Sequence, residues 1–316
     1  MTTPLKNAKL GFLLSLFTAF MWGNVPIALK EVMQELDAPT LVWYRFLIAF
    51  LILLPVLAIK KNLPFRKIQQ NPKFLMLLSF MTLGIVGNFL LMSQSLTYTT
   101  PTVVQIVIQL SSVGLLFSSV IVFKERLSHT QLLGVIILVV GLLLFFNTNL
   151  IEMIASFNDY SIGVGLALLA SLSWVFFALA QKVALRDFSS LQILLILNGI
   201  GMIFLLPFVD FSAILTLSTL KFILLAYCGL NTVLGYGALG EAMRLWEVSK
   251  VSAMITFTPL FTLAFSLTFA AIWPTMFEHP SLNFLGYIGV FTVVFGAMFM
   301  VIGETLIRSL TQKHAK

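Results

Sequence analysis

Charged residues are scarce in this sequence. Asp, Glu, Lys and Arg make up 10% of its 316 residues, whereas 59% are hydrophobic and the mean hydropathy is +1.02. In a typical soluble domain about a quarter of the residues are charged. Too few polar residues are therefore present to cover a water-exposed surface, and the composition predicts a protein whose main solvent is the lipid bilayer.

Cysteine and histidine are also rare. Cys228 is the sole cysteine, so no disulfide can form within the chain. His129, His279 and His314 share no metal-ligand spacing, which argues against a structural zinc site. The sequence holds no G-x-x-x-x-G-K-[ST] phosphate loop and no Ser/His/Asp or paired-carboxylate cluster. We therefore expect no cofactor, no metal and no enzymatic activity.

Long apolar runs dominate what is present. A membrane-spanning helix needs about 20 mostly apolar residues, with every backbone group bonded inside the helix. The first run follows two lysines, as in a secretory signal, but it is long and lacks a small-residue cleavage site, so we expect a retained helix. The pattern predicts an all-α polytopic membrane protein with ten transmembrane helices, at residues 10–29, 41–59, 74–93, 102–123, 131–146, 162–181, 191–209, 222–240, 251–272 and 283–302.

Several short signals mark the ends and bends of these helices. The stretches "SHTQ" (128–131) and "SSLQ" (189–192) fit the capping box, in which a Ser and a Gln three residues later bond each other's backbone N–H groups. Pro26 and Pro259 lie inside predicted helices. Proline lacks the N–H that the helix needs, so both positions predict kinks.

The distribution of lysine and arginine predicts the orientation. If the ten helices alternate in direction, almost all lysines and arginines fall in the loops and tails on the side of the N-terminus. The opposite side holds only Lys30 and Lys221. Positive residues are enriched in cytoplasmic loops, so we expect both termini in the cytoplasm.

The two halves of the chain share a faint repeat. Trp22 and Trp174 each lie eight residues before a lysine, and the two copies are 152 positions apart (174 − 22). Other matched pairs follow in the same order: Gly11/Gly163, Leu14/Leu166, Leu16/Leu168, Ala28/Ala180, Lys30/Lys182, Pro55/Pro207, Gly87/Gly235, Gly134/Gly289 and Gly141/Gly296. Each half, residues 1–150 and 151–316, holds five predicted helices, so the second half enters the membrane from the opposite side. This predicts an inverted 5+5 repeat, an arrangement that many secondary transporters use for alternating access.

Three stretches carry a family resemblance. "FMWGNVPIALK" (20–30), "APTLVWYRFLIAFLILLP" (38–55) and "FKERLSHTQLLGVIILVVGLLL" (123–144) resemble the drug/metabolite transporter superfamily, EamA type. There a Trp-Gly pair, an Arg-Phe pair and a Glu-Arg-Leu turn before a glycine-rich helix recur in similar order. The resemblance covers residues 10–305. It implies ten helices, cytoplasmic termini and passage of small metabolites, often outward, through a central cavity.

Polar and aromatic residues inside the apolar helices are the candidate substrate-binding residues, because their burial in hydrocarbon is costly. The two tryptophans would lie at mid-depth and stack on a substrate, or else pack in the core. The amides would line a hydrated path, or else hold helices together by hydrogen bonds. The full candidate set is Trp22, Asn24, Arg45, Asn88, Gln105, Gln109, Trp174, Asn198, Asn231 and Tyr236.

Charged residues in or beside the helices have competing interpretations. Arg45 could hold a substrate carboxylate or snorkel outward to the headgroups. Glu241 is the coupling candidate: it could carry a proton or bind an ammonium group, or it could pair with Arg244 three residues later. Lys30 and Lys182, at helix ends, are expected to snorkel.

These features predict a secondary transporter. The leading function is export of a small polar or amphipathic metabolite such as an amino acid. The alternatives are a component of a lipid-linked sugar flippase and a non-transporting accessory or sensor protein. Expected partners are the small-molecule substrate, the lipid bilayer and a coupling ion such as H+, with no nucleic acid. We expect a multi-pass protein of the bacterial inner membrane, as a monomer or weak homodimer.

Overall fold

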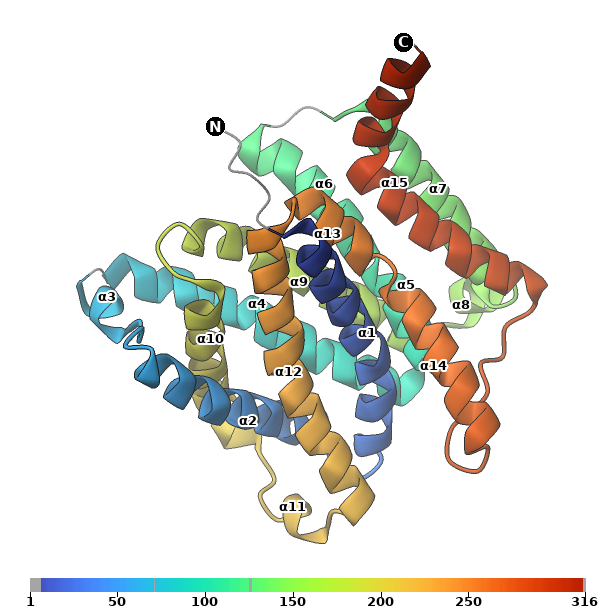
Figure 1. The fold of residues 1–316 in the computed structure, drawn as a ribbon. Helices are drawn as coiled ribbons and strands as arrows, with labels where there is room; N and C mark the ends of the chain where they lie inside the picture. Colours follow the sequence, from blue (N-terminus) through green and yellow to red (C-terminus); the bar gives the residue numbers. More distant parts are fainter. Residues whose placement is uncertain (1–6, 71, 125–126, 315–316) are drawn as a thin grey trace.

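The computed structural model describes residues 7–70, 72–124 and 127–314, and within these ranges every regular element is helical, as predicted. Figure 1 shows how the helices are arranged. Their bounds are α1 (Ala8–Val32), α2 (Ala38–Ile59), α3 (Phe65–Gln70), α4 (Pro72–Tyr98), α5 (Pro101–Ile108), α6 (Leu110–Phe123), α7 (His129–Phe145), α8 (Leu150–Ser156), α9 (Asp159–Ala184), α10 (Ser190–Leu205), η1 (Leu206–Phe208), α11 (Ala213–Thr216), α12 (Thr219–Leu245), α13 (Val248–Ile255), α14 (Thr258–Ile272) and α15 (Phe284–His314).

The ten predicted segments are all present as helices. Nine helical stretches of the described chain are long and apolar enough to cross a membrane. The tenth segment, α7, has 17 residues, which is the lower limit for a spanning helix, and it packs side by side with α15 (Figure 1). Because the number of segments is even, α1 begins and α15 ends on the same face of the protein.

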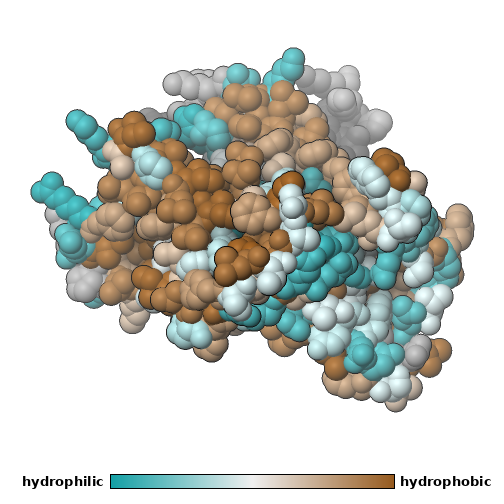
Figure 2. Space-filling model, turned by 90° about the horizontal axis from the view of Figure 1, so that it is seen from below, coloured by the Kyte–Doolittle hydropathy of each residue, from teal (hydrophilic) through white to brown (hydrophobic). Residues whose placement is uncertain are grey.

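The outer surface of the protein is hydrophobic. Ile59, Ile121 and Leu215 are 82%, 78% and 86% exposed, and many other large apolar side chains share this exposure. In Figure 2, hydrophobic residues cover much of the face seen from below, and hydrophilic residues gather on another part of it. Exposed apolar patches of this extent mark contact with another apolar phase, here the lipid of a bilayer.

Two predicted helices are interrupted in the middle. The predicted segment 102–123 breaks at Gln109, between α5 and α6, and the predicted segment 251–272 breaks between α13 and α14. The prediction of one continuous helix in each of these two segments is therefore wrong. Pro259 lies in the first turn of α14, where its missing N–H costs nothing, so it begins a helix and does not kink one. The two breaks touch, because Gln109 Nε2 donates to the carbonyl of Thr256 at 2.8 Å.

Both predicted capping boxes are confirmed. At the start of α7, Ser128 Oγ accepts from Gln131 N at 3.2 Å, and Ser128 N donates to Gln131 Oε1 at 2.9 Å. At the start of α10, Ser189 and Gln192 form the same pair of bonds, at 3.3 and 2.9 Å. Each box satisfies two N–H groups that the helix itself leaves unbonded.

The helices of the first half pack against those of the second half in four main pairs. α1 packs on α12, α4 on α9, α2 on α10 and α7 on α15. In order along the chain, α9 corresponds to α1, and α12 corresponds to α4. Exchanging the two halves therefore turns the pair α1–α12 into the pair α9–α4. The pairs α2–α10 and α7–α15 stay the same pairs, with their two helices swapped.

Candidate functional site

A cavity of about 470 Å³ is lined by helices of both halves. Most of the candidate binding residues lie on its wall, although they come from six different helices. These residues are Trp22, Arg45, Asn88, Gln105, Gln109, Trp174, Asn231 and Tyr236. Such a volume lies in the range typical of small-molecule sites. The structure thus brings together residues that are far apart in the sequence at one cavity, whose mainly apolar wall carries several polar side chains.

The two tryptophans of the repeat meet on one tyrosine. The Trp22 ring centroid lies 4.9 Å from that of Tyr236, and the Tyr236 hydroxyl is within hydrogen-bonding reach of the Trp174 side chain. Trp22 lies against Gly235, where an added Cβ would be 2.5 Å from the indole Nε1. The glycine therefore makes room for the ring. Both tryptophans face the cavity, and together with Tyr236 they form an aromatic wall whose polar atoms are indole N–H groups and a hydroxyl.

Arg45 is a buried cation on the cavity wall. Only 4% of the residue is exposed, so it does not snorkel to the headgroups. Its Nη2 donates to Thr232 Oγ1 at 3.3 Å, and its guanidinium carbon lies 4.3 Å from the Phe89 ring centroid. Its Nε has no hydrogen-bond partner, and no carboxylate of the described chain pairs with it. A buried guanidinium without an anion is costly, and an anionic ligand would offset that cost.

Four amide side chains of the cavity share one bonding pattern. Each donates its NH₂ group to a backbone carbonyl of another helix, and the four bonds are Asn88 to Ala170 (2.8 Å), Gln105 to Trp22 (2.9 Å), Gln109 to Thr256 (2.8 Å) and Asn231 to Met21 (2.6 Å). A carbonyl can only accept, so the NH₂ must face it and the amide oxygen must point elsewhere. None of these oxygens receives a hydrogen bond from the described residues. The amides therefore join helices, as one interpretation of the sequence held, and their oxygens keep free acceptor capacity at residues of the cavity wall.

Pro26 explains why α1 needs such bonds. A proline has no N–H, so the carbonyl four residues earlier, that of Trp22, lacks its helical partner. Gln105 of α5 supplies the missing donor. On either side, Asn231 of α12 binds the carbonyl of Met21, and Thr262 of α14 binds that of Gly23 at 2.6 Å. Three helices thus hold the middle of α1 through three consecutive carbonyls.

Two candidate binding residues lie outside the central cavity. Asn24 accepts a hydrogen bond from the Tyr227 hydroxyl, and this contact joins α1 to α12. Asn198 donates to the carbonyl of Leu194 in its own helix and lines a separate cavity of about 50 Å³. Its side-chain oxygen is buried without a partner. In this structure, therefore, neither side chain lines the central cavity with the other amides, because the rotation of each helix turns it toward other neighbours.

Glu241 also lies away from the cavity. Its carboxylate accepts from Arg244 Nε at 2.9 Å and makes a second contact with Arg244 Nη2, and both side chains are largely exposed. The structure thus gives Glu241 the local ion pair that was the alternative to a coupling role. No acidic side chain of the described chain lines the central cavity.

Replacing Glu241 with glutamine should therefore leave transport nearly unchanged. We expect uptake rates within about twofold of wild type, because exposed ion pairs contribute little free energy. The measurement is the pH profile of flux in reconstituted vesicles. A profile that flattens in Glu241→Gln would show that this carboxylate does carry a coupling proton.

Sequence reasoning missed two residues that contact the Arg45 guanidinium, Phe89 and Thr232. Phe89 is one of 30 phenylalanines, and nothing in the sequence marks it. Thr232 lies beside Asn231 in α12. A hydroxyl next to an amide in an apolar helix could have marked Thr232 as a candidate. Ser111, Ser112 and Thr256, at the two helix breaks, were hidden because the breaks themselves were not predicted.

The fold and the cavity define a class of protein: a multi-pass membrane protein with a central cavity that carries polar side chains, as in a small-molecule transporter. Comparison of the sequence gives the family. The EamA-like transporter family matches residues 9–147 and again residues 161–302, so the chain belongs to this family and is a transporter rather than an enzyme.

Named relatives agree with this assignment. The "Uncharacterized inner membrane transporter YhbE" of Escherichia coli (strain K12) is 45% identical over 309 residues, covering 98% of this chain and 96% of the relative. An "Uncharacterized transporter" of Haemophilus influenzae is 46% identical over 299 residues, covering 94% and 96%. A solved structure titled "Crystal structure of protein" matches with a TM-score of 0.63 at 12% identity, over 92% of this chain and 97% of the other, which shows the similarity of the fold.

Proposed function

We propose that the protein exports a small zwitterionic metabolite such as an amino acid across the inner membrane, by alternating access between two inverted halves. The observation that carries the proposal is Arg45, a buried guanidinium that faces a polar cavity without an anion. Guanidinium groups bind carboxylates through charge-assisted hydrogen bonds, which are stronger than neutral ones. A substrate carboxylate would supply the missing partner.

The rest of the cavity suits the other parts of a zwitterion. An ammonium group needs acceptors, and the amide oxygens of Gln105, Gln109 and Asn231 have no donor within the described chain. An apolar or aromatic substrate side chain would pack on Trp22 and Tyr236. A purely cationic solute would instead meet Arg45 and be repelled.

Two observations support alternating access. The family matches the chain twice, once in each half, and the main helix pairs map onto one another when the halves are exchanged. The helices that break, α5–α6 and α13–α14, occupy corresponding places in the halves, and their breaks meet at the cavity. Discontinuous helices at the midplane are typical of substrate sites in transporters built from repeats.

The charge distribution and the cavity opening indicate how the protein is oriented in the membrane. Gln131, Met243 and Val301 line the cavity near the start of α7 and near the ends of α12 and the spanning part of α15. These helix ends share the face on which α1 begins, and that face carries most lysines and arginines. By the positive-inside rule it is the cytoplasmic face, so a solute would enter the cavity from the cytoplasm.

The direct test is flux in sealed vesicles. Purified protein in liposomes loaded with unlabelled amino acids should accumulate the matching labelled amino acid by counterflow, and Arg45→Met vesicles should not. Inside-out membrane vesicles then give the direction. If no amino acid is moved and a stoichiometric partner copurifies, the protein is an accessory subunit and the proposal fails.

The aromatic wall provides a second test. Trp22→Ala and Trp174→Ala should each raise the apparent KM about tenfold, because each removes a large apolar contact with the substrate. Trp246→Ala is the matched control, since Trp246 packs on Phe12 and does not line the central cavity. Wild-type kinetics in both cavity variants would mean that these rings only pack.

A further inference from the structure

A second cavity, of about 250 Å³, lies at the opposite end of α1 from the opening of the central cavity. It is enclosed by the end of α1, the start of α5, the middle of α14 and the segment between α14 and α15. Lys30, Thr102, Ser266 and Glu278 are among its lining residues. We call it the outer pocket, after the face that the charge distribution assigns to the outside.

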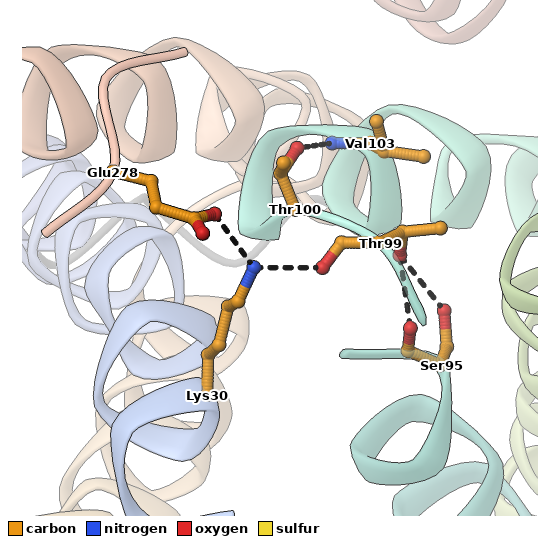
Figure 3. A network of polar contacts seen from close by, with 6 residues as sticks. All are labelled: Lys30, Ser95, Thr99, Thr100, Val103 and Glu278. Atoms are coloured by element: carbon orange, nitrogen blue, oxygen red, sulfur yellow. Dashed lines mark hydrogen bonds and ion pairs between the residues drawn. The ribbon is translucent and has the colours of Figure 1, made fainter. Parts of the chain in front are cut away.

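The outer pocket contains one ion pair that is easily opened. Lys30 Nζ lies 3.2 Å from Glu278 Oε2 and donates to the carbonyl of Thr99, also at 3.2 Å (Figure 3). The Glu278 side chain is 79% exposed, so water competes for both charges and the pair is weak. The other carboxylate of the pocket, Glu31, already has a buried partner in Lys221 at 2.6 Å. Lys30 and Glu278 are therefore the charges that a ligand can reach.

The same pocket contains two hydroxyl groups without partners. Thr102 is 2% exposed and Ser266 is 8% exposed, and both hydroxyl oxygens are buried with no hydrogen bond in the described chain. Buried polar groups are nearly always bonded, so two unbonded hydroxyls at one pocket require an explanation. A polar ligand in the pocket would provide one once rotation of the side chains turns the hydroxyls toward it, since each hydroxyl can both donate and accept.

The outer pocket and the central cavity are lined by different residues of the same helices. Gln105, on the wall of the central cavity, donates to the carbonyl of Trp22, and Thr262 donates to that of Gly23. Thr102 lies one turn of α5 beyond Gln105, and Ser266 lies one turn of α14 beyond Thr262. The two cavities therefore follow one another along the same three helices, α1, α5 and α14.

We propose that the outer pocket is a second binding site for the transported zwitterion, occupied as it leaves the central cavity. The substrate carboxylate pairs with Lys30 and the substrate ammonium with Glu278, in exchange for the ion pair between these two side chains. The Thr102 and Ser266 hydroxyls bond the buried end of the ligand. This inference rests on the proposed function, because it assumes that the solute carries both charges.

Equilibrium binding distinguishes the two sites. Full-length protein in lipid nanodiscs is incubated with pools of the radiolabelled common amino acids, and the equivalents retained per chain are counted. Wild type should bind one equivalent in each cavity. Arg45→Met should lose the central equivalent, and Lys30→Gln combined with Glu278→Gln should lose the outer one. Thr102→Val and Ser266→Ala should each weaken the outer equivalent about tenfold.

The matched control is Glu247→Gln combined with Lys250→Gln, which removes another exposed ion pair that lines neither the central cavity nor the outer pocket. Each variant should still bind the equivalent in the cavity that its substitutions do not touch, and this binding shows that the variant is folded. A single equivalent that Arg45→Met abolishes and the Lys30/Glu278 variant leaves unchanged would overturn the outer site but keep the proposed function. Absence of binding from every pool would overturn both.

Discussion

Replacing Arg45 with methionine should reduce transport about a hundredfold without lowering the stability of the protein. The loss follows because a charge-assisted bond to a buried group contributes about 3 kcal/mol, which corresponds to two powers of ten in affinity. The stability should stay level or rise, because the substitution removes a buried cation that has no anion and replaces it with an apolar side chain of similar length. Loss of the contacts with Thr232 and Phe89 offsets only part of this gain.

The measurement combines counterflow rates with the melting temperature of the purified protein. Glu241→Gln serves as the control for loss of a charged side chain outside the cavity. Opposite effects on rate and stability are typical of a functional site, which is held in a strained state for the ligand. A methionine variant that transports normally but melts early would show instead that Arg45 holds α2 to α12.

Replacing Gly141 with alanine should destabilise the protein by about 3 kcal/mol, the largest effect that we expect from a single methyl group in this chain. In the contact between α7 and α15, a Cβ on Gly141 would lie 2.5 Å from the backbone nitrogen of Val293, and one on Gly134 would lie 2.6 Å from that of Met300. Backbone atoms cannot move aside as a flexible side chain does. The helices would have to separate along their whole contact, so we expect a melting temperature lower by roughly 5–10 °C.

The control is Gly237→Ala in α12, where an added Cβ meets nothing within 4 Å. That change should be neutral or slightly stabilising, since alanine favours the helix over glycine by about 1 kcal/mol. The corresponding glycines of the second half, Gly289 and Gly296, approach the α7 backbone equally closely and should behave like Gly141. Equal melting temperatures for Gly141→Ala and Gly237→Ala would contradict the close contact.

Local signals in the sequence predicted the helices well. The apolar runs gave ten segments because a bilayer imposes length and composition on every crossing, and these constraints are visible residue by residue. The capping boxes at Ser128 and Ser189 were predictable for the same reason: each depends on four adjacent residues. The breaks at Gln109 and Thr256 were not predicted, because the contact that joins them, from the Gln109 side chain to the Thr256 carbonyl, links residues far apart in the chain.

The sequence predicted which residues could form the candidate site, but not where in the fold they would meet. Polar residues in apolar helices stand out in the sequence, and most of the set lies on one cavity wall. Asn24 and Asn198 have the same signal but face elsewhere, because the direction in which a side chain points depends on the rotation of its helix against its neighbours. For the same reason the sequence left both interpretations of Arg45 open, and the burial of its side chain decided between them.

By itself, the sequence determined that this chain crosses the membrane repeatedly, that it belongs with the EamA-like transporters and that its charges favour one orientation. These properties depend on composition, on the order of the segments and on short motifs, all of which are local. Only the tertiary structure decided that Trp22 and Trp174 meet on Tyr236, that Arg45 faces the cavity without an anion, and that Lys30 pairs with Glu278 at a second pocket. Each of these contacts joins residues from different helices, so its geometry exists only once the helices have packed.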